Sequence, residues 1–257
     1  KAVYAGSIPA SASKNMKISV IGAGYVGLVT GVCLSSFGHR VTILDKNNSK
    51  IRLLTKGNSI IFEKDLPELL RNQLKKKKLL LTSSYADIAH NDVFIICVDT
   101  PFINKKPYKK NLISSIESLL SVISDDSLII IKSTAPIGTF REIESLVNKS
   151  KMKQNVSLCV HPEFLREGSA VSDFLNPERI VFGTRNPGDI NLFKEIYCKD
   201  YFQEKILIMS PESAELTKYA ANGFLATKIS FINEISRISE RCGADIEEIK
   251  LGLGTDS

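Results

Sequence analysis

The stretch KISVIGAGYVG, residues 17–27, indicates the fold of this chain. It begins with a short, largely apolar run that has the composition of a buried β-strand. The run leads directly into three glycines, Gly22, Gly24 and Gly27. Glycines at this spacing allow a tight turn, a close approach of the backbone to a pyrophosphate, and close packing of the next helix on the strand. The pattern therefore predicts a strand, a phosphate-binding turn and a helix, as in dinucleotide-binding domains.

An acidic residue completes this pattern. Asp45 ends the next strand-like run, roughly 20 residues beyond the glycine turn, where a carboxylate can accept hydrogen bonds from the adenosine ribose. A carboxylate at this position repels a 2′-phosphate, so the sequence predicts NAD rather than NADP as cofactor. The alternative is a tight strand-to-helix turn that binds no nucleotide.

Strand-like and helical patterns alternate from Met16 onward. Helical patterns separate most of the strands, for example at residues 26–37, 112–123 and 139–147. This alternation indicates βαβ units, so we expect an α/β fold with a Rossmann-like, doubly wound, mostly parallel sheet followed by a long helix. The strand-like runs are rich in apolar residues, and they are KISVIG, RVTILD, LLLTS, DVFIICV, SLIIIKST, VSLCV, RIVFG and KILIMS.

The predicted long helix follows the last of these strands. Ser210 is a suitable N-cap, Pro211 suits the first helical position, and Gly243 is a natural stop. Lys218 and Asn222 lie four residues apart within it and therefore share a face. They are either a solvated stripe or an ammonium and an amide that point at a reacting oxygen.

The composition of the chain excludes several classes of protein to which it could belong. The chain has 257 residues, enough for one large domain or one domain with an appendage, and 43% of them are hydrophobic. No apolar run approaches the roughly 20 residues of a membrane span, so we expect no membrane partner. The formal net charge is +6, but the lysine clusters lack the interleaved aromatic residues that stack on bases. We therefore expect a solvated basic surface, which also steers anionic small molecules, rather than a nucleic-acid partner.

Cysteine usage indicates a reducing compartment. The number of cysteines is odd and no CxxC pair occurs, so we predict reduced thiols, no metal site and a cytoplasmic location. The five cysteines are Cys33, Cys97, Cys159, Cys198 and Cys242.

Residues 1–15 differ from the rest of the chain. They are small and polar and contain no apolar core of a signal peptide, so we expect a cloning remnant or a disordered extension there. The predicted domains are a Rossmann-like NAD-binding domain at residues 16–210, and a long central helix with the start of a dimerisation region at residues 211–257.

Three further strand-like runs end in polar segments. These segments are CVDTP at residues 97–101, STAPIGT at residues 133–139 and HPEFLREG at residues 161–168. Each by itself is typical of a turn. Parallel strands, however, bring their carboxyl ends to one edge of the sheet, where open α/β sheets bind ligands. Together they favour a site beside the glycine turn.

These motifs resemble those of the UDP-glucose/GDP-mannose dehydrogenases. The resemblance rests on KISVIGAGYVGLVTG, CVDTP, STAPIGT, HPEFLREGSAVSDFLNPERIVFG and ELTKYAANGFLATKISFINE, and it extends from Met16 to about Asp256. It implies oxidation of the C6 alcohol of a nucleotide sugar to a carboxylate, in two hydride transfers to two NAD. The PEFLREGSAVSDFLNPERIV segment is most similar to members that act on UDP-glucose, with GDP-mannose and UDP-N-acetylmannosamine as alternatives.

The resemblance also implies roles for individual residues. Glu163 is expected to take part in acid–base chemistry with an ordered water, and Thr134 to lie near that water and the nicotinamide. Lys218 is expected to stabilise the developing oxyanion with the help of Asn222. The positions implied for NAD are Gly22, Gly24, Tyr25, Val26, Gly27, Asp45, Lys50, Thr100, Thr134 and Glu167. The positions implied for the sugar nucleotide are Glu163, Phe164, Leu165, Arg166, Glu167, Lys218 and Asn222.

Two features depart from the family pattern. Asp99 stands where a small or neutral residue usually precedes Thr-Pro, and an extra carboxylate there is expected to reshape contacts near the cofactor. None of the cysteines matches the family's nucleophile, since Cys242, the nearest in order, lies at a predicted helix end. Without that thiol the oxidation cannot be completed, so we expect a fragment that binds NAD and does not turn over UDP-glucose.

Two other functions stay open. A β-hydroxyacid dehydrogenase shares the glycine turn and the lysine–asparagine pair but lacks PEFLREG. A stand-alone NAD-binding module without chemistry would also fit the missing cysteine. The resemblance further implies a homodimer formed through the long helix, which carries apolar residues around much of its girth: Phe224, Leu225, Ile229, Ile232 and Ile235.

Overall fold

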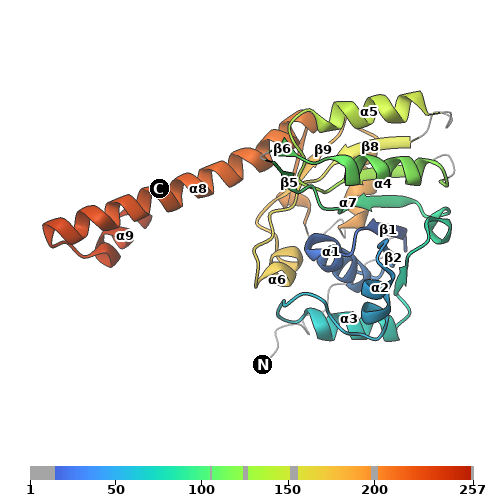
Figure 1. The fold of residues 1–257 in the computed structure, drawn as a ribbon, viewed down its shortest axis with the longest axis horizontal. Coiled ribbons are helices and arrows are strands. Elements are labelled where there is room, and N and C mark those ends of the chain that lie inside the picture. Colours follow the sequence, from blue (N-terminus) through green and yellow to red (C-terminus); the bar gives the residue numbers. More distant parts are fainter. Residues whose placement is uncertain (1–14, 105, 124–126, 151–155, 198–201, 256–257) are drawn as a thin grey trace. The chain divides into compact units, whose positions relative to one another are not determined.

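The computed structural model describes residues 15–104, 106–123, 127–150, 156–197 and 202–255 (Figure 1). Cys198 and residues 1–14 of the extension predicted at residues 1–15 lie outside these residues. The chain divides into two compact units, the first ending at Glu215 and the second starting at Leu216. Each unit is described separately.

The first unit alternates strands and helices, as predicted. Its strands are β1 (Lys17–Ile21), β2 (Arg40–Leu44), β3 (Leu79–Thr82), β4 (Val93–Ile96), β5 (Phe102–Ile103), β6 (Lys106–Pro107), β7 (Ser127–Ile131), β8 (Val156–Val160), β9 (Ile180–Gly183) and β10 (Ile206–Met209). Its helices are α1 (Tyr25–Ser36), α2 (Asn48–Thr55), α3 (Leu66–Lys75), α4 (Lys110–Leu120), α5 (Thr139–Lys149), α6 (Ala170–Leu175) and α7 (Asp189–Ile196), with short 3-10 helices η2 (Tyr85–Ile88) and η3 (Gln203–Lys205).

Eight strands form one sheet in the order β10-β9-β8-β7-β4-β1-β2-β3. The chain builds β1, β2 and β3 outward in one direction and then crosses to β4 on the other side of β1. The strand order therefore reverses between β1 and β4, and this is where doubly wound folds bind dinucleotides. The predicted fold class is confirmed.

One strand pairing in this sheet is antiparallel. β9 runs against β8, with Val160 opposite Gly183, while the other pairings are parallel. The connection after β8 contains only the short helix α6, which packs on α1 rather than crossing back over the sheet. The chain therefore re-enters the sheet from the edge at which it left, and this reverses the direction of β9.

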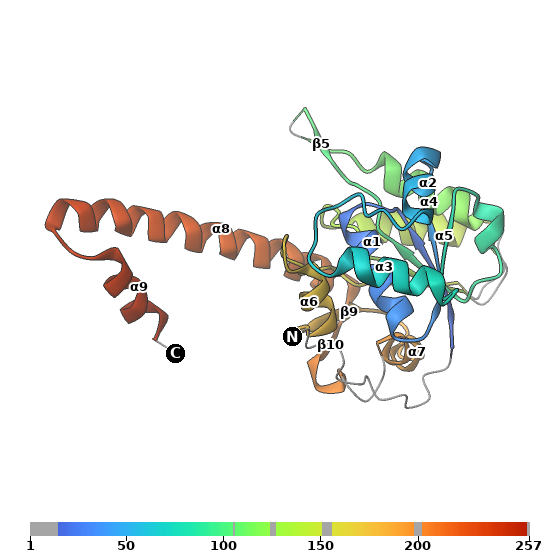
Figure 2. The same ribbon diagram turned by 90° about the horizontal axis from the view of Figure 1, so that it is seen from below.

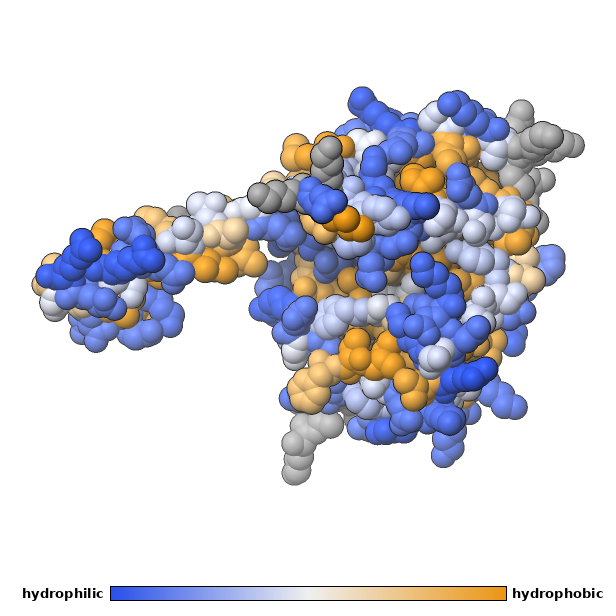
Figure 3. All heavy atoms as spheres, viewed as in Figure 1, coloured by the Kyte–Doolittle hydropathy of each residue, from blue (hydrophilic) through white to orange (hydrophobic). Residues whose placement is uncertain are grey.

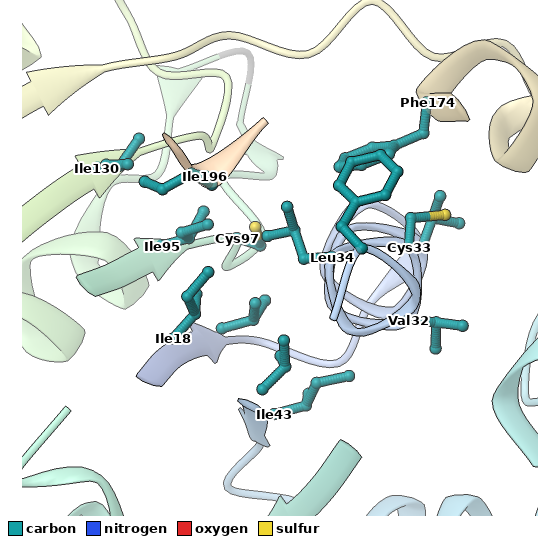
Figure 4. Close-up of a cluster of buried hydrophobic side chains, with 14 of the residues drawn as sticks. Ile18, Val32, Cys33, Leu34, Ile43, Ile95, Cys97, Ile130, Phe174 and Ile196 are labelled. Carbon is teal, nitrogen blue, oxygen red and sulfur yellow. The ribbon is translucent and has the colours of Figure 1, made fainter. Parts of the chain in front are cut away.

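Alternating side chains of the central strands fill two hydrophobic clusters. On β4, Ile95 belongs to the cluster that contains α1, α3, α6 and α7, whereas Phe94 and Ile96 belong to the cluster under α4 and α5. Figure 1 shows α4 and α5 on one side of the strands and α1, α3 and α6 on the other. Figure 4 shows Ile18, Ile95 and Ile130 of three neighbouring strands beside α1 in the first cluster. Burial on both faces explains why these strands are apolar at nearly every position.

The cysteines of the core carry free thiols. Cys33, Cys97 and Cys159 are buried, and Cys242 is exposed. Burial raises the pKa of the Cys97 thiol to about 12, so this thiol stays protonated and poorly nucleophilic at neutral pH. Among the described residues, no cluster of three or more His, Cys, Asp or Glu side chains is placed to hold a metal ion. No helix in the same residues is long and apolar enough to cross a membrane.

The long helix α8 (Pro211–Cys242) contains 32 residues. Ser210 caps its first turn, since its Oγ accepts the N–H of Ser213 at 3.2 Å. Gly243 ends it with a φ of 73°, a left-handed conformation that glycine adopts without strain. The predicted start and stop of this helix are confirmed. The short helix α9 (Ile246–Gly254) follows in the second unit.

Candidate functional site

The glycine turn lies at the carboxyl end of β1. A Cβ on Gly22 would lie 2.5 Å from the carbonyl oxygen of Cys97, and a Cβ on Gly27 would lie 1.8 Å from the carbonyl oxygen of Gly22. Both positions therefore require glycine for packing. Gly24 is different, because the nearest atom to its Cβ position is Asp99 Oδ1 at 3.5 Å. The open space there leaves room for a pyrophosphate at the start of α1, where helix N–H groups point outward.

Asp45 connects the end of β2 to this turn. Its Oδ2 accepts the backbone N–H of Ala23 and the Lys50 ammonium, both at 2.9 Å, and its Oδ1 accepts the N–H of Asn47 at 2.9 Å. Burial alone raises the pKa of a carboxyl group, but these hydrogen bonds outweigh it and hold the pKa of Asp45 below its ordinary value. A carboxylate offers about four lone-pair sites, so Oδ1 retains capacity for one ribose hydroxyl. The predicted positions of Asp45 and Lys50 fit NAD.

The polar ends of β4 and β7 are joined side by side. The Thr100 hydroxyl donates to the carbonyl oxygen of Thr134, and the Ser133 hydroxyl donates to the carbonyl oxygen of Val98 at 2.7 Å. The segments CVDTP and STAPIGT thus form one continuous rim. The β5–β6 hairpin, which the sequence patterns do not predict, follows CVDTP and stands out from the first unit (Figure 2).

A buried polar pair joins β7 to β8 beneath this rim. Lys132 and His161, which are 3% and 4% exposed, follow these strands directly. Lys132 Nζ lies 3.0 Å from His161 Nε2, and His161 Nδ1 donates to the carbonyl oxygen of Val181 at 2.8 Å. Tyr197 Oη lies 2.5 Å from the same Nε2. Burial and the neighbouring Lys132 charge push the pKa of His161 well below its ordinary value, so the imidazole is neutral.

The loop after β8 contains the remaining residues of HPEFLREG. Glu163 is half-buried and accepts the N–H of Leu165 at 2.7 Å. Arg166 is exposed and its guanidinium pairs with Asp173 at 2.6 Å, so it points along the loop toward α6. This hydrogen bond holds the pKa of Asp173 below its ordinary value. Glu167 is exposed at the same edge.

The aromatic and apolar side chains of this loop anchor it to the core. Phe164 packs against the cluster under α4 and α5, and Leu165 packs against the cluster that contains α1. The guanidinium of Arg179 lies 4.4 Å from the centroid of the Phe164 ring. Phe164 and Leu165 are partly buried, so their packing fixes the backbone of this loop at the edge of the sheet.

Two buried carboxylates at this edge were missed by sequence reasoning. Glu215, at the start of α8, accepts the N–H groups of Gly138 and Phe140 at 2.8 and 2.7 Å and so fixes the STAPIGT loop. Glu63 accepts the N–H groups of Gly168 and Ala170. Glu215 opens the ELTKYAANGFLATKISFINE motif but was given no role, and Glu63 lies outside every motif; only their partners, which are distant in sequence, distinguish them from surface glutamates.

Lys218 and Asn222 belong to the second unit. They lie four residues apart on α8, as predicted. The first unit contains all the other predicted site residues. The roles predicted for Lys218, Asn222, Thr134 and Glu163 stay predictions.

The fold and its carboxyl edge define the class of protein. A glycine turn with room for a pyrophosphate, a carboxylate at the end of β2 and a strand-order reversal between β1 and β4 are the parts of a dinucleotide-binding Rossmann domain. NAD is the cofactor that this domain binds, as predicted.

The chain belongs to the UDP-glucose/GDP-mannose dehydrogenase family, and the predicted resemblance is thereby confirmed. The family's NAD binding domain matches residues 16–200, and its central domain matches residues 212–257. The UDP-glucose 6-dehydrogenase YwqF of Bacillus subtilis is 43% identical over 94% of this chain and 55% of its own length. The UDP-glucose 6-dehydrogenase of Rickettsia prowazekii is 40% identical over 94% of this chain and 56% of its own length.

Solved structures show the same relationship. A UDP-glucose dehydrogenase from Pyrobaculum islandicum superimposes with a TM-score of 0.89 at 34% identity, over 98% of this chain and 59% of that one. A GDP-mannose dehydrogenase from Pseudomonas aeruginosa has a TM-score of 0.85 at 30% identity, over 94% of this chain and 57% of that one. The chain therefore spans little more than half the length of these relatives.

Proposed function

We propose that the protein to which this chain belongs oxidises the C6 alcohol of UDP-glucose to a carboxylate. NAD, when bound, accepts the hydride in each of two successive oxidations. The observation that carries this proposal is the grouping of the glycine turn, Asp45, Thr134 and the HPEFLREG loop at one edge of the sheet. Identity to several UDP-glucose 6-dehydrogenases supports UDP-glucose over other nucleotide sugars.

Each residue has a distinct part in the proposed chemistry. Thr134 and Glu163 hold a water and move its proton, since a half-buried carboxylate can act as a base beside the cofactor. The Lys218 ammonium and the Asn222 amide stabilise negative charge that develops on the reacting oxygen. The backbone of Phe164, Leu165 and Arg166, with Glu167, lines the site for the sugar nucleotide and cofactor.

The experiment is an assay of NAD reduction by the whole protein with different nucleotide sugars. UDP-glucose, GDP-mannose and UDP-N-acetylmannosamine are each offered with NAD, and NADH is followed by absorbance. We expect about two NADH for each UDP-glucose consumed, since a primary alcohol needs two hydride transfers to reach a carboxylate. NADH production with another of these nucleotide sugars in place of UDP-glucose would refute the assignment of UDP-glucose. The absence of NADH production with all three would refute it as well.

We further propose a cytoplasmic homodimer, in which residues 16–210 form the NAD-binding domain and residues 211–257 the central helical region. The free, buried thiols support a reducing compartment. Figure 3 shows apolar side chains along α8. The exposed apolar residues of this helix support a partner surface, and they are Leu216, Phe224, Leu225, Ile229, Phe231 and Ile238.

A further inference from the structure

Phe62 and Glu63 lie in environments opposite to those usual for their side chains, since the aromatic ring is exposed and the carboxylate is buried. Phe62 is 100% exposed, whereas the next residue, Glu63, is only 4% exposed. Burying a carboxylate is unfavourable unless its oxygens accept hydrogen bonds. The loop between α2 and α3 thus leaves an aromatic ring in solvent while it buries a charge, which indicates that specific partners hold Glu63.

These partners come from two distant segments of the chain. The Tyr25 hydroxyl and the Gly168 N–H donate to Oε1 of Glu63, and the Ala170 N–H donates to Oε2 at 3.1 Å. Tyr25 lies within the glycine turn, 38 positions before Glu63, and Gly168 lies 105 positions after it. Figures 1 and 2 both show the loop before α3 beside the loop before α6.

The protonation of Tyr25 agrees with this arrangement. Burial, followed by the hydrogen bond to Glu63, raises the pKa of Tyr25, so its hydroxyl keeps the proton that it donates. The same hydroxyl lies 3.1 Å from the carbonyl oxygen of Arg166. Tyr25 therefore contacts the HPEFLREG loop both directly and through Glu63.

We propose that Glu63 is a positioning residue for the NAD and sugar site. It fixes the HPEFLREG loop against the glycine turn, so that Glu163 and Glu167 keep their distance from the cofactor. Asp173 holds the other side of this loop, since it accepts the N–H of Arg166 at 2.9 Å. The inference rests on the proposed function, because a positioning role requires that the loop and the turn act on one ligand.

The decisive variant is Glu63→Gln, which keeps the size of the side chain. Its amide has one acceptor oxygen and one NH2 group, so either orientation sets an NH2 donor against an N–H donor of Gly168 or Ala170. We expect NADH to bind about tenfold more weakly to this variant in a fluorescence titration of the 257-residue chain, because a lost charge-assisted hydrogen bond displaces the loop. Glu68→Gln is the matched control, since Glu68 is exposed five residues further on, and we expect it to change the Kd less than about twofold.

A double-mutant cycle separates positioning from general destabilisation. If Tyr25 acts through Glu63, adding Tyr25→Phe to Glu63→Gln should weaken NADH binding by less than about a further twofold. If the increases in Kd of the two single variants multiply in the double variant, Tyr25 and Glu63 act independently and the proposed coupling between them is wrong. An unchanged Kd in a folded Glu63→Gln variant would overturn the inference. Should Glu63→Gln fail to fold, Glu63→Asp decides, because it keeps the charge and withdraws the carboxylate from its partners: a Kd raised about threefold or more supports the role, and a smaller change overturns it. An unmodified chain that binds no NADH would instead contradict the proposed cofactor site itself.

Discussion

The carboxylate of Asp45 accepts the backbone N–H of Ala23 at 2.9 Å. The residue that is proposed to bind the ribose is therefore directly bonded to the turn that is proposed to bind the pyrophosphate. This hydrogen bond sets the spacing between the two proposed parts of the cofactor site, so Asp45 has a structural function beside the ligand-binding function proposed for it.

Replacing Asp45 by alanine should weaken NADH binding about ten- to a hundredfold, because a hydrogen bond to a charged group contributes roughly 1.5–3 kcal/mol. It should also reduce the preference for NADH over NADPH, since the repulsion of a 2′-phosphate is lost. Fluorescence titration with both cofactors measures this. Asp87→Ala, at an exposed residue, is the control. Equal affinity of the unmodified chain for NADH and NADPH would contradict the assignment.

Replacing either of two glycines of the turn by alanine should have different effects on folding and on NADH binding. Gly27→Ala should prevent folding or lower the midpoint of thermal unfolding strongly, because the new Cβ would overlap the Gly22 carbonyl oxygen at 1.8 Å. Gly24→Ala should fold, because its Cβ position is open, yet bind NADH at least about tenfold more weakly, because it occupies the space for the pyrophosphate. Circular dichroism and NADH titration test both. Unchanged NADH binding by Gly24→Ala would place the pyrophosphate elsewhere.

The stability of the chain should fall as the pH drops below about 6.5. The pKa of His161 is well below its ordinary value in the folded state, so the unfolded chain binds the proton more readily. The stability that neutral His161 contributes is present above the unfolded pKa and is lost as the pH falls toward the folded pKa. In urea unfolding between pH 7 and pH 5, the free energy of unfolding of His161→Gln should depend less steeply on pH than that of the unmodified chain. His90→Gln, at an exposed histidine, should keep the dependence of the unmodified chain.

Glu212 should stabilise the first unit in a pH-dependent manner. It bridges Arg141 at 2.9 Å and Arg185 at 2.6 Å, and the hydrogen bond from Arg141 contributes most to lowering its pKa to about 2. Its contribution is therefore present above about pH 4.5 and is lost as the pH falls toward 2. Thermal unfolding of Glu212→Gln should differ from that of the unmodified chain at pH 6 and converge with it near pH 2.5. A difference that persists unchanged at low pH would mean that charge is not its cause.

The proposed dimer should depend on the apolar residues of α8. Phe224→Asp, at a residue that is 62% exposed, should shift the chain from dimer to monomer in light scattering, because a buried unpaired charge opposes association. Glu234→Asp, on the same helix, should leave the mass unchanged. An unmodified chain that is monomeric at high concentration would contradict the proposed interface.

The sequence alone was sufficient for the features that depend on neighbours in the chain. The eight strands of the main sheet, the glycine turn and both ends of α8 were predicted, because each follows from local periodicity, turn chemistry or capping. Asp45 was also found from the sequence, since its distance from the glycine turn is a property of the βαβ unit. The β5–β6 hairpin was missed, because strands of two residues are too short to show an alternating pattern.

Only the tertiary structure decided the direction of β9 and the partners of the buried charges. Glu63 and Lys132 are ordinary charged residues in the sequence, and each is buried because its partners lie on other segments, 105 positions away for Gly168 and 29 for His161. The free energy of burying a charge depends on those partners and not on adjacent residues. A local pattern therefore reveals the strand ends that form the proposed site, whereas the residues that hold those ends together become visible only once the chain has folded.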